Sequence, residues 1–359
     1  MAIYLSLGPS GAGKDTLLLA GRALLEGNSD VVFIQRHLTR NAASVTDLEI
    51  SVTSDAFAAG LAANTYALHW EAHGTRYGVP SAELSAALGQ GRRCVLNVSR
   101  TQVPIVRETF GDRYEVYVLH ITASFATLRT RLLSRGRESS EDVEKRLARA
   151  MRDTPSGPHV ITILNEATVE EGAIRVARAL AGTLKYSLWL LPAGPVAAWA
   201  RIIIGGLAAE TKMAPFPPHV TLCPSFEATQ RDAVAKARTV AEGLAPTLLE
   251  LESLVDSTAY FRAIVVTVNV SGAVVAATRT ARERIFPEGD QRRDAPFEPH
   301  LSLLYGSHEA ADRAALVGAV GRWPEEPCPV GAVALVCTTG ESYACWQIVE
   351  TIPLPSRVT

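Results

Sequence analysis

The sequence predicts two different folds in succession: an α/β unit, with a parallel sheet and helices on both faces, and an α+β unit with internal two-fold character. The first is indicated by alternating strand-like and helix-like runs, which begin with a strand, a glycine-rich loop and a helix. The second is indicated by two similar segments, 216–222 and 297–303, in a half where strands dominate. Because 359 residues are many for one core, we expect two domains, 1–182 and 184–359.

In the first half, apolar runs of strand length alternate with longer runs of helical period. We expect strands at Ala2–Leu7, Val31–Arg36, Cys94–Val98, Tyr114–Ile121 and Val160–Leu164. We expect helices at Lys14–Leu25, Ser124–Arg135, Ser140–Arg152 and Val169–Leu180. Alternation of this kind predicts parallel strands that are connected by helices.

In the second half, strands outnumber helices, and the same His-containing element occurs twice. The expected strands are Tyr186–Leu191, His219–Cys223, Thr247–Val255, Phe261–Val270, Pro299–Leu304, Gly331–Thr338 and Ala344–Glu350. The expected helices are Val196–Leu207, Thr229–Glu242, Val274–Ile285 and Ala310–Val320. This pattern predicts an α+β domain.

The overall composition is that of a globular protein with a net charge of −2, which argues against a dominant nucleic-acid-binding surface. The N-terminus lacks the basic region of a secretory leader, and no apolar stretch has transmembrane length. The five cysteines show no C-x-x-C spacing, so we expect reduced thiols in the cytoplasm. Cys223, beside the first His-containing segment, is expected to be a small buried residue rather than a nucleophile.

Gly8-Pro-Ser-Gly-Ala-Gly-Lys14 follows a strand and opens a helix, which is the context that the GxxxxGK phosphate-binding loop requires. Its glycines let backbone N–H groups turn toward phosphates, and the helix N-terminus adds positive potential. Lys14 would reach the β- and γ-phosphates and is the candidate catalytic residue. The alternative is a turn that only packs strand against helix. The residues expected to hold the nucleotide are Gly8, Ser10, Gly11, Ala12, Gly13, Lys14, Asp15 and Thr16.

The Ser or Thr that usually follows the loop lysine and binds Mg²⁺ is replaced here by Asp15, with Thr16 next. The metal site must therefore be rearranged, and either Asp15 or Thr16 is the candidate ligand. Farther along, Arg131, Arg135 and Arg137 lie in a basic, glycine-containing segment. Arginines there can stabilise a transferring phosphoryl group, like a lid, although a solvated helix face is the alternative.

The stretch Trp70–Gly78 mixes aromatic residues, charges and glycine, and is expected to be a loop. Loops on a rigid scaffold often carry function. His73 or Tyr77 could contact the acceptor substrate, and a packing role is the alternative.

Each of the two similar segments carries a His, an apolar residue and a hydroxyl residue after proline. Alternate residues of a strand share a face, so each His and its hydroxyl partner should point the same way. Two imidazoles suit phosphodiester cleavage, because one can activate water while the other protonates the leaving oxygen. A satisfied core histidine or a metal ligand is the alternative, but no Cys or carboxylate stands at ligand spacing. The candidate catalytic side chains are His219, Thr221, His300 and Ser302.

The first half resembles the ribose 1,5-bisphosphate phosphokinases, which are relatives of guanylate kinase. The resemblance lies in GPSGAGKDTLL, Arg36-His-Leu-Thr-Arg40, WEAHGTRYGVP and RLLSRGRES, over roughly residues 1–182. The Lys-Asp-Thr sequence is similar to that family's own loop, and no guanine-recognition pattern is evident. The resemblance implies phosphorylation of ribose 1,5-bisphosphate to 5-phosphoribosyl 1-diphosphate with ATP and Mg²⁺, and it implies that Arg36 and Arg40 bind the substrate.

The second half resembles the two-histidine (2H) phosphoesterases, most specifically in Pro299-His-Leu-Ser-Leu-Leu-Tyr305-Gly306. This resemblance implies opening of a cyclic phosphate without a metal, by His219 and His300 as the acid/base pair. It also implies a pocket shaped by Tyr260, Arg262 and Tyr305.

Together the two resemblances predict a bifunctional enzyme of phosphonate catabolism that acts on small sugar phosphates. The phosphoesterase would open 5-phosphoribosyl 1,2-cyclic phosphate, and the kinase would phosphorylate the product. Two alternatives stay open: an RNA end-healing kinase and 2′,3′-cyclic phosphodiesterase, against which the acidic net charge speaks, and a nucleotide-binding regulatory module without catalysis.

Overall fold

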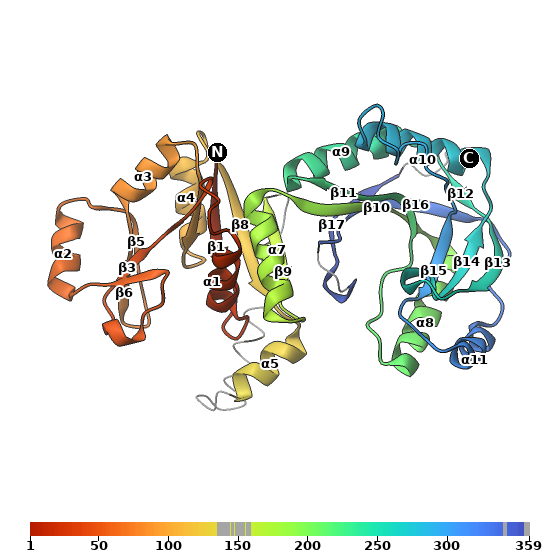
Figure 1. The fold of residues 1–359 in the computed structure, drawn as a ribbon, viewed down its shortest axis with the longest axis horizontal. Helices are drawn as coiled ribbons and strands as arrows, with labels where there is room; N and C mark the ends of the chain where they lie inside the picture. The colour runs from red at the N-terminus through yellow and green to blue at the C-terminus, as the bar shows by residue number, and fades with distance from the viewer. Residues whose placement is uncertain (135–143, 145–146, 148–154, 156–158, 340–342, 355–359) are drawn as a thin grey trace. The chain divides into compact units, whose positions relative to one another are not determined.

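The computed structural model describes residues 1–134, 144, 147, 155, 159–339 and 343–354 (Figure 1). The chain divides into two compact units, Met1–Thr183 with Gly340–Cys345, and Leu184–Thr339 with Trp346–Thr359. We call them unit 1 and unit 2, and each is described by itself.

Unit 1 is built on a parallel sheet with the strand order β2-β7-β1-β8-β9. Its strands are β1 (Ala2–Leu7), β2 (Val31–Ile34), β7 (Arg93–Asn97), β8 (Glu115–Thr122) and β9 (Val160–Leu164). The central strand β1 is buried along its whole length, which explains its nearly continuous apolar run. The predicted α/β fold with a parallel sheet is therefore confirmed.

The helices of unit 1 are α1 (Lys14–Leu24), α2 (Ser54–Ala62), α3 (Ser81–Gly89), α4 (Gln102–Phe110), α5 (Phe125–Ser134) and α7 (Val169–Ala181). On one face of the sheet, Leu84 of α3 and Val106 of α4 share a core with Ile3 of β1. On the other face, α1 packs against α7 (Figure 1). The helix predicted at Ser140–Arg152 lies outside the described residues, apart from positions 144 and 147.

Unit 1 also holds a small sheet with the order β4-β3-β6-β5, made of β3 (Arg36–Leu38), β4 (Glu49–Ser51), β5 (Tyr66–Ala72) and β6 (Thr75–Pro80). The prediction of a loop at Trp70–Gly78 is wrong, because this stretch forms the β5–β6 hairpin. His73 and Gly74 make its turn, with φ of 51° and 71°. Two successive residues of positive φ fit the twist of a tight hairpin. The polar and aromatic residues that suggested a loop alternate between the two faces of the sheet.

The single strand predicted at Val31–Arg36 is also wrong in extent. The chain leaves the parallel sheet after Ile34 and enters the small sheet at Arg36, where β3 pairs with β4 and β6. A run of apolar residues does not show where a strand changes partners.

Unit 2 contains a sheet with the order β12-β16-β10-β11-β15-β14-β13, and β17 also pairs with β16. The strands are β10 (Leu184–Pro192), β11 (Val220–Ala228), β12 (Leu248–Leu249), β13 (Leu251–Asp256), β14 (Ile264–Val268), β15 (His300–Leu304), β16 (Cys328–Cys337) and β17 (Gln347–Pro353). All of their pairings are antiparallel. The helices are α8 (Gly194–Thr211), α9 (Gln230–Glu242), α10 (Gly272–Ile285) and α11 (Ala310–Val320). The predicted α+β fold is confirmed.

Three predicted strands of unit 2 are broken in two or begin with a 3-10 turn in the structure. The predicted strand Thr247–Val255 is divided into β12 and β13. β12 pairs with β16 and β13 pairs with β14, so the two halves have different neighbours in the sheet. Phe261–Val270 starts only at Ile264, because Tyr260–Arg262 form a 3-10 turn. Ala344–Glu350 starts only at Gln347, after a second 3-10 turn at Tyr343–Cys345.

Candidate active sites

The glycine-rich loop between β1 and α1 has the backbone geometry of a phosphate-binding loop. Gly11 and Gly13 have φ of 88° and 77°, in the left-handed region that glycine adopts without strain. A Cβ at Gly8 would lie 2.0 Å from the carbonyl oxygen of Ile121 in β8. Only glycine therefore lets the loop pass this close to the sheet, and the α1 N-terminus is left facing the space an anion would fill.

The loop lysine lies in a compact polar cluster with Asp15 and with Asn97, the last residue of β7. Lys14 Nζ lies 2.5 Å from Asp15 Oδ1 and 2.6 Å from Asn97 Oδ1, and Asn97 Nδ2 donates to Asp15 Oδ1 at 3.0 Å. Burial lowers the pKa of Lys14 despite its carboxylate partner. Burial would raise the pKa of Asp15, but the charge and hydrogen bond of Lys14 lower it overall. Thr16 is exposed beside them.

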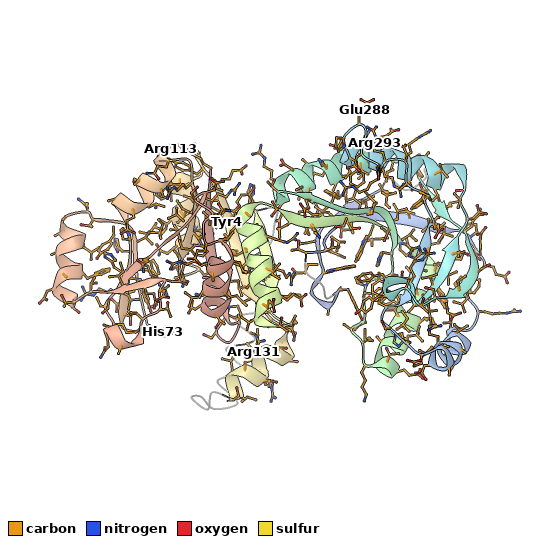
Figure 2. All side chains as sticks on the ribbon, in the orientation of Figure 1. Tyr4, His73, Arg113, Arg131, Glu288 and Arg293 are labelled. Atoms are coloured by element: carbon orange, nitrogen blue, oxygen red, sulfur yellow. The ribbon has the colours of Figure 1, made fainter. Side chains whose placement is uncertain are left out.

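Arg131 of α5 reaches the phosphate-binding loop (Figure 2). Its guanidinium donates to the carbonyl oxygens of Asn165, at 3.0 Å, and of Gly11, at 3.5 Å. The Asn165 side chain donates in turn to the carbonyl of Ala12 at 2.8 Å, while Ser10 is exposed. The predicted residues Arg135 and Arg137 lie outside the described residues.

The small sheet brings the expected acceptor-binding residues together. Arg36 pairs with Glu49 at 2.5 Å and donates to the Asn97 carbonyl at 2.9 Å. Its guanidinium lies 4.9 Å from the ring centre of Tyr77, whose hydroxyl accepts from Arg40 at 3.0 Å. His73 is exposed at the hairpin turn (Figure 2). The buried Glu49, which the sequence reasoning did not single out, compensates the charge of Arg36.

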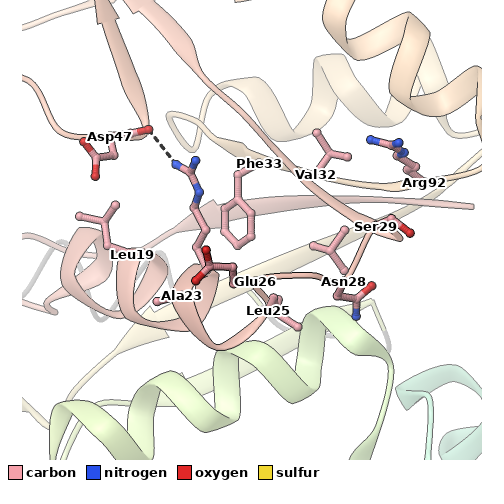
Figure 3. A pocket seen from close by; sticks show the side chains of 12 residues that line it. Leu19, Ala23, Leu25, Glu26, Asn28, Ser29, Val32, Phe33, Asp47 and Arg92 are labelled. Atoms are coloured by element: carbon pink, nitrogen blue, oxygen red, sulfur yellow. Dashed lines mark hydrogen bonds between the residues drawn. The ribbon is translucent and has the colours of Figure 1, made fainter.

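A cavity of about 670 Å³ in unit 1 lies elsewhere (Figure 3). It is lined by the last turns of α1 and by β2, including Arg22, Glu26, Phe33 and Arg92. The phosphate-binding loop opens the same helix at its other end. This cavity is therefore not the candidate nucleotide site.

In unit 2, strands β11 and β15 pair antiparallel with Val220 opposite Leu301. Extending this register by one residue in each direction places His219 opposite Ser302, and Thr221 opposite His300. Side chains alternate along a strand, so all four point to the face opposite that of Val220 and Leu301. The two His-containing motifs, far apart in sequence, thus meet as two cross-strand pairs.

The two imidazoles are held in the same way. His219 Nδ1 lies 2.7 Å from the carbonyl oxygen of Pro217, and His300 Nδ1 lies 2.8 Å from that of Glu298. A carbonyl only accepts hydrogen bonds, so each Nδ1 carries a proton and each Nε2 remains for chemistry. Both motifs therefore orient the imidazole by the same hydrogen bond, from Nδ1 to the carbonyl oxygen two residues earlier in the chain.

Aromatic rings surround the first imidazole. Trp189 stacks on His219 with ring centres 3.5 Å apart and an interplanar angle of 7°. The Tyr305 hydroxyl lies 3.2 Å from His219 Nε2, and the Tyr305 ring stacks on Phe216 at 4.0 Å. Phe261 meets Tyr305 edge-on at 5.4 Å. Trp189 was missed from the sequence, because only the structure shows that its strand, β10, pairs with β11.

The remaining predicted residues of unit 2 lie around this face. Ser302 is buried and donates to the Phe261 carbonyl at 3.3 Å, and Thr221 is half-buried. Arg262, which is half-buried, pairs with the exposed Glu298 at 2.7 Å, beside His300. Tyr260 is exposed, and its carbonyl accepts from the N–H of Gly306 at 2.8 Å.

Three further features bear on the chemistry. Cys223 is buried, and burial raises the pKa of its thiol to about 12, which makes it a poor nucleophile. In the part of the chain that the structure describes, no three His, Cys, Asp or Glu side chains gather as a metal site would require. Among the same residues, no helix has the length and apolarity to cross a membrane.

Comparison with known proteins decides the family of the first unit. The guanylate kinase family profile matches residues 1–182. The chain belongs to the guanylate kinase family. Residues 195–341 match the 2'-5' RNA ligase superfamily. A guanylate kinase-like domain is thus joined to a 2H phosphoesterase domain, and the predicted combination of kinase and phosphodiesterase is confirmed.

Two curated relatives of the kinase domain illustrate the match. Ribose 1,5-bisphosphate phosphokinase PhnN of Bradyrhizobium diazoefficiens is 36% identical over 178 residues, which are 50% of this chain and 87% of that protein. Bifunctional ribose 1,5-bisphosphokinase-thymidine phosphorylase of Cupriavidus pinatubonensis is 37% identical over 177 residues, which are 49% of this chain and 29% of that protein.

Two solved structures are similar to one unit each. Guanylate kinase from Anaplasma phagocytophilum is 21% identical, with a TM-score of 0.36, over 50% of this chain and 84% of its own. E. coli LigT in apo form is 17% identical, with a TM-score of 0.33, over 49% of this chain and 99% of its own. At such scores, the family assignment rests on the sequence matches.

The phosphoesterase domain is expected to lose stability in mild acid. Burial lowers the pKa of His219 to about 4, below its ordinary value of 6.5. Between these values the unfolded chain binds the proton more strongly, so the free energy of unfolding falls as the pH drops from 6.5 to 4. The loss approaches roughly 3 kcal/mol.

Denaturant unfolding at several pH values, followed by tryptophan fluorescence, measures this loss. Trp189 stacks on His219, so its emission reports on this domain. The His219→Phe variant keeps a ring there but cannot titrate, and its unfolding should depend less on pH in this window. Equal pH dependence in both proteins would contradict the assignment to His219.

The kinase loop is expected to reject any side chain at Gly8. Because the obstacle is the backbone oxygen of Ile121, Gly8→Ala should lower the free energy of unfolding of this domain by about 1–3 kcal/mol. Gly89→Ala in α3, where a Cβ meets nothing within 4 Å, is the matched control and should cost nothing. Thermal unfolding of both variants checks this, and equal melting temperatures would count against the close approach.

Proposed function

We propose that this chain catalyses two successive reactions on one sugar. The phosphoesterase domain hydrolyses 5-phosphoribosyl 1,2-cyclic phosphate to ribose 1,5-bisphosphate. The kinase domain then transfers a phosphoryl group from ATP to the 1-phosphate, which gives 5-phosphoribosyl 1-diphosphate. Both reactions belong to phosphonate catabolism.

The antiparallel pairing of β11 with β15 is the observation that supports the first step most strongly. It sets two imidazoles and two hydroxyls on one face of the sheet. Water attacks the phosphorus of the cyclic ester, the P–O2 bond breaks, and O2 leaves with a proton. One imidazole takes a proton from the water and the other gives a proton to O2. The phosphoryl group stays on O1, so the product is ribose 1,5-bisphosphate.

We assign the general base to His219 and the general acid to His300. Burial lowers the pKa of His219 to about 4, so it is neutral near pH 7, and the Tyr305 hydroxyl marks a hydrogen-bonding position at its Nε2. Burial lowers the pKa of His300 as well, while the hydrogen bond to the Glu298 carbonyl acts to raise it, and the charges of Arg262 and Glu298 act in opposite directions. His300 is also less buried than His219, so it retains a proton more readily.

The phosphate and the rest of the sugar need donors near the two imidazoles. The Thr221 hydroxyl, across from His300, would donate to an oxygen of the cyclic phosphate. The Ser302 hydroxyl, across from His219, would do the same once it exchanges the Phe261 carbonyl for the ligand. Arg262 is half-buried and its charge acts on His300, so it could bind the 5-phosphate if it exchanged Glu298 for the ligand.

In the kinase domain, the loop N–H groups and Lys14 would hold the phosphates of ATP, and Arg131 joins them at the loop. A bound Mg²⁺ would neutralise charge on the β- and γ-phosphates, with oxygen ligands from Asp15 or Thr16. Tyr77, Arg40 and His73 of the small sheet would face the sugar phosphate. The names of the two relatives, both ribose 1,5-bisphosphate kinases, support this sugar phosphate as the acceptor.

We also propose that the functional boundary lies between residues 182 and 184. A cytoplasmic location fits the cysteines, because Cys94, Cys223, Cys328 and Cys337 are free and buried.

Substrate competition tests the proposal. The measured quantity is kcat/KM for 5-phosphoribosyl 1,2-cyclic phosphate, for adenosine 2′,3′-cyclic phosphate and for a short RNA with a 2′,3′-cyclic phosphate end. The proposal predicts the highest value for the sugar phosphate. A preference for the RNA would instead support end healing, the activity class that the 2'-5' RNA ligase superfamily match keeps open.

A further inference from the structure

Asn97, the last residue of β7, lies beside the phosphate-binding loop and contacts two of its charged side chains. β7 runs parallel to β1 with Asn97 next to Ser6, just before the loop begins. The Asn97 side chain is 6% exposed and lies between two charges: its Oδ1 accepts from Lys14 and its Nδ2 donates to Asp15. An uncharged amide is thus buried where it satisfies both members of an ion pair.

Phosphate-loop enzymes usually divide the metal-binding groups differently. A Ser or Thr hydroxyl follows the loop lysine, and an Asp at the end of a neighbouring strand supplies a carboxylate. In this chain the loop position holds the carboxylate, Asp15, and the strand position holds an amide, Asn97. Each arrangement has one carboxylate, but in this chain it lies in the loop instead of at the end of the strand.

We propose that Asp15 supplies the anionic oxygen for the Mg²⁺ of bound ATP, and that Asn97 is the positioning residue that holds the Asp15 carboxylate for this task. The inference rests on the proposed kinase function and adds a role for Asn97.

Electrostatics explains why the two positions must change together. The Nδ2 of Asn97 lies 3.0 Å from Asp15 Oδ1, so an aspartate at position 97 would set two carboxylates against each other. With serine at position 15 and Asn97 retained, the cluster would contain no carboxylate to offset Lys14. Positions 15 and 97 therefore carry one carboxylate between them, whether it is Asp15 with Asn97 or serine with aspartate. Changing only one of the two positions would leave either two carboxylates or no carboxylate.

The Asp15 carboxylate is also accessible to a ligand. Its side chain is 50% exposed, against 19% for Lys14. When the lysine turns to the phosphates of ATP, Asp15 loses that partner and keeps the hydrogen bond from Asn97. Carboxylate and hydroxyl oxygens are ligands that Mg²⁺ accepts, so Asp15 and the exposed Thr16 fit the ion.

Mn²⁺ binding, measured by electron paramagnetic resonance on the 359-residue chain with a non-hydrolysable ATP analogue, tests the exchange without any turnover. Asp15→Ser should weaken Mn²⁺ binding by about 10- to 100-fold. The double variant Asp15→Ser with Asn97→Asp moves the carboxylate to the strand. The double variant should bind Mn²⁺ at least about tenfold more tightly than Asp15→Ser, because the effects of substitutions at two residues in contact are not additive.

Two results would overturn the inference: Mn²⁺ affinity that is unchanged in Asp15→Ser, or a double variant that binds Mn²⁺ no better than Asp15→Ser. Metal-free binding of the ATP analogue by each variant shows that its phosphate-binding loop is folded. Metal-free binding of the analogue by the unaltered protein is the separate check on the kinase. If it is absent, the proposed kinase function fails, and this inference fails with it.

Discussion

His300→Ala is expected to slow the opening of 5-phosphoribosyl 1,2-cyclic phosphate by about 10²- to 10⁴-fold, the usual contribution of a general acid or base. Without the imidazole, O2 must leave without a positioned proton donor. His300 is only half-buried at the start of β15, so its loss should leave the sheet intact. Steady-state hydrolysis, followed by phosphorus NMR, measures the effect.

The pH dependence of the residual rate adds a second readout. If His300 is the acid, the fall in rate at high pH should vanish in the variant, because no proton donor remains to titrate. Phosphorylation of added ribose 1,5-bisphosphate should be unchanged. A variant that keeps more than about a tenth of the wild-type hydrolysis rate would contradict a general-acid role.

Lys14→Ala is expected to slow phosphoryl transfer to ribose 1,5-bisphosphate by about 10²- to 10³-fold. Lys14 is the charge that the loop offers to the β- and γ-phosphates, and no other loop residue replaces it. The variant also loses its hydrogen bonds to Asp15 and Asn97, but burial already disfavours the charged lysine, so the cost in stability should be small. Initial rates of ADP release at saturating acceptor measure the change.

The phosphoesterase reaction is the internal control for this variant. Ring opening should proceed at the wild-type rate, so ribose 1,5-bisphosphate should accumulate in the presence of ATP. Equal loss of both activities would indicate a folding defect rather than a role in transfer. Unimpaired phosphoryl transfer would show that the loop does not serve a kinase.

The sequence was sufficient to predict elements that are either fully buried or strongly periodic. β1 has the predicted bounds, Ala2–Leu7, and α7, Val169–Ala181, ends one residue after the predicted Leu180. The first is an apolar run that ends before a glycine, and the second has a marked helical period. Sequence did not reveal the small sheet of unit 1, since β3 and β4 have only three residues each and the polar residues around the β5–β6 turn suggested a loop.

For the sites, the sequence supplied the residue types but not their partners. The H-x-[T/S] spacing predicted a shared face, yet only the pairing of Val220 with Leu301 shows which His lies across from which hydroxyl. Trp189 and Asn97 were missed because each lies in a predicted strand whose neighbours the sequence does not specify. Asn97 had a local signal, as a polar residue at the carboxyl end of a buried strand.

The most direct test of the central claim is one phosphorus NMR experiment on the 359-residue chain with 5-phosphoribosyl 1,2-cyclic phosphate. Without ATP, the cyclic phosphate signal should be replaced by the two monoester signals of ribose 1,5-bisphosphate. When ATP and Mg²⁺ are then added, the 1-phosphate signal should give way to the paired signals of a diphosphate. A cyclic phosphate signal that persists in both conditions would contradict the account.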